Sequence, residues 1–279
     1  MSISPSLKVV ITTIILFMSA ASNILAQEDW VEYVIIKDKG VMSVSLDLRL
    51  DLYRPKYKNL LVVGSRFNKC LKNGFPTEDS LNDIFTFSDS TSVLIDKMTP
   101  NRLAGFMTYQ CMAFDIYYVK DTTGLRNEMT KLIKKKFDPR QTYILIERDK
   151  SWDYYRNFLY PRDFSSEFLI DQNYLHDLVL QGDDLKGLRK VNHWVYFKGI
   201  KNRNLFGEKL KKLKFSLDSI AYRKERGFPY ELKVSRQDSI DPASIYRLTS
   251  MLRVLAFSMN GEYDGWSTEV KSNDSLFRD

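Results

Sequence analysis

The residues with the clearest potential for chemistry are two carboxylates near the C-terminal end of the chain. Glu262 and Asp264 stand two positions apart in the segment Gly-Glu-Tyr-Asp-Gly-Trp at 261–266. Side chains two positions apart on a β-strand point to the same face. Such a pair could bind a cation, or serve as acid and base in a hydrolase. The favoured alternative is a polar strand face that ends in an Asp-Gly turn.

The two histidines, His176 and His193, offer little support for a catalytic site. A hydrolase with a serine or cysteine nucleophile needs a base positioned beside it. His176 lies next to Asp177 in a predicted helix, which is typical of a solvated residue. His193 shares a predicted strand face with Val191 and Val195, which favours a partly buried histidine over a general base.

No other pattern in the chain predicts catalysis, a cofactor or a metal. The sequence has no metal-ligand spacing, no glycine-rich phosphate loop and no nucleotide motif. We therefore predict a protein that is not an enzyme and that holds neither cofactor nor metal. Cys70 and Cys111 are its two cysteines. A disulfide between them and a pair of buried thiols are both compatible with the sequence.

Aromatic residues are the remaining indication of function. Trp266 and Tyr263 lie on the last predicted strand, and Trp194 lies on another. Exposed tryptophan and tyrosine are preferred hot spots of protein interfaces, whereas packing in the core is their favoured alternative role. The candidate binding surface consists of Glu262, Tyr263, Asp264, Trp266, His193 and Trp194.

The formal charge of +7 has no concentrated source. Lysines gather at 134–136 and at 209–214, near the ends of predicted helices, where cations suit the helix dipole. We interpret both clusters as solvated faces, because no base-stacking motif or zinc spacing accompanies them. The expected partner is another protein, with no specific nucleic-acid motif in the chain.

The first residues have the organisation of a secretory signal peptide. Lys8 precedes an apolar run from Val9 to Met18, and small residues lead to Ala26. A basic start, an apolar stretch and a small residue at the exit are typical of such a peptide. The expectation is cleavage near Ala26 and a periplasmic or secreted bacterial protein. The alternative is an uncleaved segment that anchors the chain to the membrane.

The elements that must position these residues form two series. The first series has strands at 42–50 and 60–63, a helix at 77–98, strands at 103–109 and 112–118, a helix at 125–133 and a strand at 143–146. The apolar face predicted for the first of these helices is Leu81, Ile84, Phe85 and Ile95.

The second series follows Pro161 and a helix at 166–180 that ends before Gly182. Its elements are a strand at 191–197, a helix at 205–213, strands at 215–222 and 230–235, a helix capped by Asp241 and a strand at 262–270. This β-α-β-β-α-β order predicts an α+β protein, with two tandem ferredoxin-like (split βαβ) sandwiches after a signal peptide. The expected parts are the signal peptide at 1–26, domains at 27–161 and 162–272, and a short tail at 273–279.

The C-terminal strand, Gly-Glu-Tyr-Asp-Gly-Trp-Ser-Thr-Glu-Val at 261–270, resembles the E-Y-D-G-W-x-T signature of the RraB family, regulators of ribonuclease E activity. The segments at 182–185, 191–197 and 230–236 are similar to that family's helix exit, first strand and third strand. The resemblance covers residues 168–271. It implies a domain that regulates a partner protein by binding it, without catalysis.

The N-terminal half resembles a different family. Gly-Phe-Pro-Thr-Glu at 74–78 and Ser-Trp-Asp-Tyr-Tyr-Arg-Asn-Phe-Leu-Tyr-Pro at 151–161 look like the domain of unknown function 695. That resemblance implies architecture only. The combined hypothesis is an exported, non-enzymatic binding or regulatory protein. The alternatives are a small hydrolase that uses the carboxylates of the C-terminal strand, or a ribonuclease E-type regulator if the chain stays in the cytoplasm.

Overall fold

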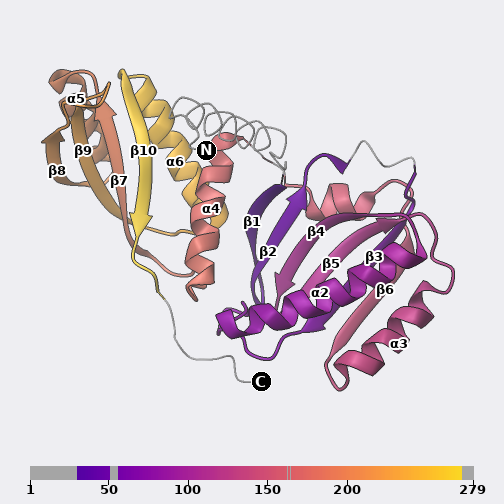
Figure 1. The fold of residues 1–279 in the computed structure, drawn as a ribbon. Coiled ribbons are helices and arrows are strands. Elements are labelled where there is room, and N and C mark those ends of the chain that lie inside the picture. The colour runs from indigo at the N-terminus through magenta and orange to yellow at the C-terminus, as the bar shows by residue number, and fades with distance from the viewer. Residues whose placement is uncertain (1–29, 51–55, 162, 164, 272–279) are drawn as a thin grey trace, which may run out of the picture.

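The computed structural model describes residues 30–50, 56–161, 163 and 165–271. The expected signal peptide and the short tail lie outside the described residues. The described chain forms two antiparallel sheets that are joined through a helix (Figure 1).

The first sheet contains a ferredoxin-like unit with an added hairpin. The unit consists of β3 (Asn59–Arg66), α2 (Glu78–Met98), β4 (Asn101–Tyr109), β5 (Met112–Val119), α3 (Leu125–Phe137) and β6 (Thr142–Arg148). Its strand order, β4-β5-β3-β6, is that of a split βαβ sandwich. The hairpin of β1 (Trp30–Lys37) and β2 (Gly40–Asp47) pairs with β4 and makes the sheet six-stranded.

Strand β1 was not predicted, and its burial explains why. Tyr33 and Val34 are adjacent in the sequence and both are buried, on opposite faces of the strand. A strand that is covered on both faces lacks the alternation of polar and apolar residues that marks a half-buried strand. The following strand, β2, is close to the one predicted.

The second sheet confirms the predicted β-α-β-β-α-β order. After α4 (Ser166–Leu180), the chain forms β7 (Arg189–Phe197), α5 (Ile200–Lys212), β8 (Ser216–Tyr222), β9 (Tyr230–Asp238), α6 (Pro242–Phe257) and β10 (Gly261–Thr268). The strand order is β10-β7-β9-β8. The carboxylate of Asp241 caps α6 by accepting a hydrogen bond of 3.0 Å from the backbone N–H of Ser244. The fold class is therefore α+β, with two ferredoxin-like sandwiches.

The apolar face predicted for α2 was partly wrong. Leu81 and Phe85 are 38% and 58% exposed, whereas Phe87 and Ile95 face the core. Compared with the prediction, the helix is turned about its own axis, so that a different set of residues, spaced four positions apart, contacts the sheet. Ser88 also faces the sheet, where its hydroxyl donates a hydrogen bond of 2.9 Å to Asp115.

A single π-helical turn, η2 (Tyr154–Leu159), covers the other face of the first sheet. Before it, the buried Trp152 stacks on Tyr118 with ring centroids 3.7 Å apart. Its indole N–H donates to the carbonyl of Tyr57 at 2.6 Å. The aromatic segment before Pro161 therefore contributes to the core, although Phe158 remains 39% exposed.

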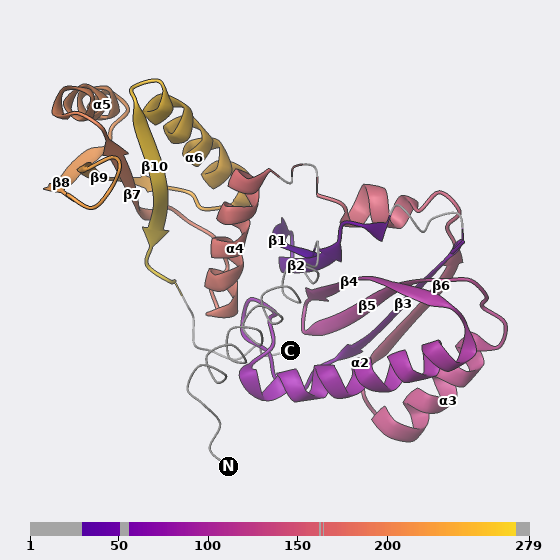
Figure 2. The ribbon, with the colours of Figure 1, turned by 45° about the horizontal axis from the view of Figure 1, so that its top comes forward.

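Helix α4 lies between the two sheets and contacts both β1 and α6 (Figures 1 and 2). Gln172 on this helix accepts a hydrogen bond of 3.0 Å from the backbone N–H of Val34. The amide of Asn73 donates to the carbonyls of Val179 and Asp183 at 2.8 and 3.0 Å. The two sheets thus share part of one core, and the expected boundary at Pro161 stays a prediction.

A disulfide bond joins Cys70 and Cys111, with their Cα atoms 5.6 Å apart. Cys111 occupies the tight turn between β4 and β5, where its φ is 63°. Its backbone N–H donates to the carbonyl of Gly74 at 3.0 Å, and its carbonyl accepts from Phe67 at 3.1 Å. The disulfide therefore reinforces the attachment of this hairpin to the loop that precedes α2.

Candidate functional site

The structure brings the six candidate residues onto the neighbouring strands β7 and β10, but not onto one surface. Trp266 lies opposite His193 on the helix-covered face, and Tyr263 lies opposite Val195. Asp264 is the extra residue of a β-bulge between Tyr263 and Gly265. A bulge shifts the alternation of side chains along a strand. It therefore places Tyr263 and Trp266, three positions apart, on the same face.

His193 and Trp266 were wrongly included in the candidate surface, because the structure buries both, as the alternation around His193 had favoured for that residue. His193 is 0% exposed and Trp266 is 8% exposed. The indole N–H of Trp266 donates a hydrogen bond of 3.0 Å to Asp171 on α4. The ring of Tyr174 packs edge-on against Trp266, with centroids 4.6 Å apart. Trp266, the tryptophan of the E-Y-D-G-W-x-T segment, therefore stabilises the packing of α4 against the sheet.

Asp171 is the centre of a buried polar network that the sequence did not reveal. Its carboxylate also accepts hydrogen bonds from the hydroxyl of Thr249 and from the guanidinium of Arg253, the latter at 3.2 and 3.3 Å. Arg253 lies 5.2 Å from the ring centroid of Tyr263. The one indication of this network in the sequence was an aspartate among the apolar residues of a predicted helix. The network connects α4, α6 and β10.

His193 and Tyr263 extend this network without providing acid–base chemistry. The hydroxyl of Tyr263 lies 2.9 Å from Nδ1 of His193. Burial, with a smaller contribution from the nearby Arg236, lowers the pKa of His193 to about 3. Burial also raises the pKa of Tyr263 well above its usual value. Both groups are therefore neutral near pH 7, and neither exchanges a proton there.

The buried His193 makes the stability of the protein depend on pH. Between pH 6.5 and about 3, the unfolded chain binds a proton that the folded chain does not. Between pH 7 and pH 5, the free energy of unfolding should therefore fall by about 2 kcal/mol more in wild type than in His193→Gln. Urea titrations of both proteins at the two pH values measure this difference. Equal pH dependence in the two proteins would contradict the assignment.

The opposite, open face of the C-terminal sheet carries the remaining candidates. Trp194 is half-buried at its centre, with the ammonium of Lys233 5.0 Å from its ring centroid. Gly265 lies across from Trp194, and a Cβ at this glycine would meet nothing within 4 Å. The surface beside the tryptophan is therefore open at this position. We call Trp194, Lys233, Glu262, Asp264 and Arg226 the Trp194 face.

One ion pair, between Arg226 and Asp264, lies at the rim of the Trp194 face. Arg226 donates to Asp264 at 2.7 Å and lies 3.8 Å from the ring centroid of Tyr196. Glu262 is exposed on the edge strand β10. The carboxylate of Asp264 is thus engaged by a cation, which is the arrangement of a polar surface rather than of an acid–base pair.

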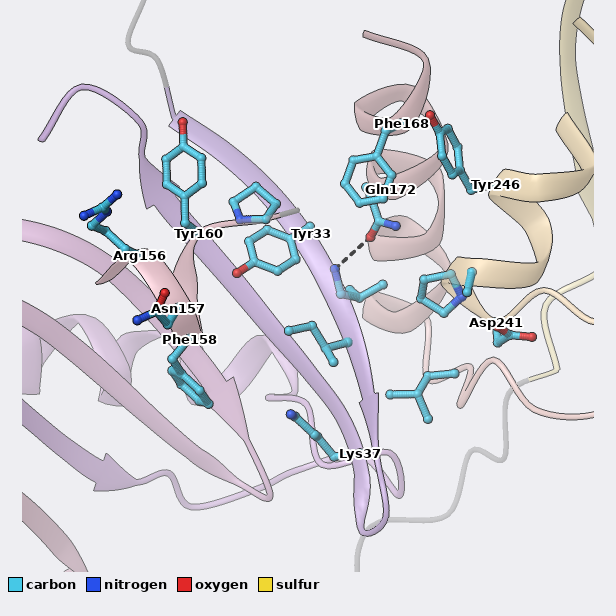
Figure 3. Close-up of a pocket in the computed structure, with 16 residues that line it drawn as sticks. Tyr33, Lys37, Arg156, Asn157, Phe158, Tyr160, Phe168, Gln172, Asp241 and Tyr246 are labelled. Carbon is cyan, nitrogen blue, oxygen red and sulfur yellow. Dashed lines mark hydrogen bonds between the residues drawn. The ribbon is translucent and has the colours of Figure 1, made fainter. Parts of the chain in front are cut away.

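A groove of about 950 Å³ lies beside α4, away from the Trp194 face (Figure 3). The edge of β1 runs between its two walls. Side chains of η2, among them Arg156 and Phe158, form one wall. Phe168 and Gln172 of α4 and the start of α6 form the other. The sequence did not predict this groove, because β1 lies more than 100 residues before the segments that form its walls.

Within residues 30–50, 56–161, 163 and 165–271, no group of three or more His, Cys, Asp or Glu side chains is arranged to hold a metal ion. None of the helices in the described part of the chain is both long and apolar enough to cross a membrane.

The comparison with curated proteins finds no match. Two solved structures align with 76% of this chain at low TM-scores. One is the crystal structure of a candidate glycine cleavage system transcriptional repressor, with 8% identity, a TM-score of 0.24 and 98% of that chain covered. The other is an unknown protein from Galdieria sulphuraria, with 9% identity, a TM-score of 0.21 and 99% coverage.

Family models match both parts of the sequence and confirm the two resemblances. The model described as a family of unknown function, DUF695, matches residues 28–160. The model described as regulator of ribonuclease activity B matches residues 170–268, which include β7, β10 and the Trp194 face. The chain therefore joins a first part that matches the DUF695 family to a second part that matches the family of regulators of ribonuclease activity B.

Proposed function

We propose that this protein is a non-catalytic regulator that binds another protein through the Trp194 face. The match to regulators of ribonuclease activity supports a regulatory role exerted by protein binding. The observation that carries the choice of surface is the half-buried Trp194 beside the open surface at Gly265. A partly exposed tryptophan at the centre of a surface patch is a preferred hot spot of protein interfaces.

The charges around Trp194 suit selective recognition. Arg226 pairs with Asp264, Lys233 lies over Trp194, and Glu262 is exposed on β10, so that both signs occur on one face of the sheet. Mixed charges at the rim of an interface favour the correct partner and repel surfaces of the wrong pattern. The helices α5 and α6 cover the other face of this sheet, which leaves the Trp194 face free for a partner (Figure 1).

Changing Trp194→Ala should weaken partner binding by about 2 kcal/mol, because truncation of a central hot spot removes its buried contact area. The measurement is capture of the partner from native cells by in vivo crosslinking, followed by titration of the identified partner. Phe257→Ala is the matched control, since this aromatic is 82% exposed on α6, away from the Trp194 face. Equal binding by wild type and Trp194→Ala would contradict the proposed surface.

The proposal places the protein outside the cytoplasm. Disulfides persist in oxidising compartments such as the bacterial periplasm, and the Cys70–Cys111 bond suits such a setting. The sequence of the first 26 residues supports export through a cleaved signal peptide. Cell fractionation with mass spectrometry of the mature N-terminus tests this. An uncleaved chain, still beginning at residue 1 and found in the cytoplasm, would contradict export. Ribonuclease E would then be the first partner to assay.

A further inference from the structure

The groove beside α4 contains a segment of unpaired sheet edge. Strand β1 is the last strand of its sheet, and Lys37 pairs with Gly40 across the hairpin turn. The N–H of Val34 points away from β2, because it donates to Gln172 on α4. Backbone groups alternate in direction along an antiparallel strand. The peptide group of Ile36, two residues further on, therefore also points outward, and Ile36 lines the groove.

Helix α4 covers only part of this edge. Gln172 occupies the edge at Val34, and Nδ1 of His176 lies 3.4 Å from the carboxylate of Glu32, two residues earlier on the strand. Beyond Val34, toward Lys37, the edge lines the groove between the residues of η2 and Asp241 at the start of α6 (Figure 3). An open strand edge next to a helix is the geometry in which proteins add a strand from a partner.

Gln172 offers a second recognition element for a backbone. Its carbonyl oxygen points toward the N–H of Val34, and its amide nitrogen points away from that strand (Figure 3). This side chain is 1% exposed, and its Nε2 has no hydrogen-bond partner among the described residues. A buried amide nitrogen without an acceptor is costly. A carbonyl or carboxylate oxygen placed in the groove would satisfy it.

The charged residues of the groove favour an acidic ligand. Lys37 and Arg156 are exposed on its walls, and no described carboxylate forms an ion pair with either. Among the described lining residues, Asp241 is the one carboxylate. It accepts hydrogen bonds from Ser244 at 3.0 Å and Ser239 at 2.9 Å, so its charge is directed to the start of its own helix.

The walls provide apolar contact on both sides of the edge. The ammonium of Lys37 lies 5.9 Å from the ring centroid of Phe158, which is 39% exposed. On the opposite wall, Phe168 and Tyr246 pack edge to face with centroids 5.3 Å apart. Side chains of an extended strand alternate in direction. One strand could therefore place apolar residues against the aromatic rings and acidic residues toward the cations.

We propose that this groove binds an extended, acidic peptide segment of a partner protein, which adds to the edge of β1 beside Gln172. The site is distinct from the Trp194 face and does not depend on it. The backbone of the segment would pair with Ile36 and Gln172, and its carboxylates would meet Lys37 and Arg156.

The test is selection from a displayed library of random peptides of about twelve residues. The full chain serves as bait. The expected result is enrichment of acidic sequences with alternating apolar residues. The best enriched peptide is then titrated by fluorescence anisotropy against wild type and Lys37→Glu/Arg156→Glu, and the double variant should bind at least about tenfold more weakly. Lys209→Glu/Lys212→Glu on α5 is the control with the same change in net charge.

Each other outcome would overturn the proposal. Enrichment of basic sequences, or no enrichment, would show that the groove does not recognise an acidic strand. An equal loss of affinity in the α5 control would reduce the effect to net charge. Loss of peptide binding in Trp194→Ala, with binding retained in Lys37→Glu/Arg156→Glu, would place the peptide on the Trp194 face instead. Circular dichroism of all variants establishes that they remain folded.

Discussion

Replacement of Asp171 by leucine is expected to lower the free energy of unfolding by about 3–5 kcal/mol. The carboxylate is fully buried and accepts hydrogen bonds from Trp266, Thr249 and Arg253. Its removal leaves the guanidinium of Arg253 and the indole N–H of Trp266 without their acceptor. A buried donor without an acceptor destabilises the fold, because its desolvation is no longer compensated by a hydrogen bond. Urea unfolding followed by tryptophan fluorescence and by circular dichroism measures the change.

Two variants separate this effect from a general effect of leucine on α4. Asp177→Leu makes the same change at an exposed position of the same helix and should stay within about 0.5 kcal/mol of wild type. Asp171→Leu/Arg253→Met should recover part of the loss, because it also removes the uncompensated cation. A cost for Asp171→Leu no larger than that of Asp177→Leu would show that the network does not stabilise the fold.

Loss of the disulfide is the second large expected effect. The bond joins cysteines separated by 41 positions. The chain-entropy relation for a loop of that length predicts that Cys70→Ala/Cys111→Ala lowers the unfolding free energy by about 4 kcal/mol. Because both side chains are buried, the loss of packing adds to the loss of the covalent constraint.

The measurement is urea unfolding of wild type and the double variant, each with and without dithiothreitol. Reductant should destabilise wild type and leave the variant unchanged. If the protein isolated from its native cells carried two alkylatable thiols, the disulfide would not belong to the functional state. The disulfide would then give no support to an oxidising compartment.

Several features of the fold could be predicted because local sequence determines them. Asp241 followed by Pro242 specified the start of α6, since the cap and the fixed φ of proline act within one helical turn. The alternation around His193 placed it on the same face as Val191 and Val195, where the structure buries it. These signals were enough to give the order β-α-β-β-α-β in the second half of the chain.

The candidate site was predicted less well, because its surface depends on contacts between distant segments. The bulge at Asp264 turned Trp266 inward, and nothing in the residues of β10 alone indicated that Asp171, 95 positions earlier, would accept its indole N–H. Trp194 could be placed on a strand, but its partial exposure required the sheet to have one open face.

The sequence by itself determined the two α+β units, their element order and most helix ends, because periodicity and capping operate over a few residues. Only the tertiary structure decided which face of α2 is buried, that β1 forms a sheet edge partly covered by α4, and that Asp171 lies at the centre of a network. The groove between η2, β1 and α6 exists because α4 lies against β1. Such contacts depend on how whole elements pack, and no short segment of sequence contains that information.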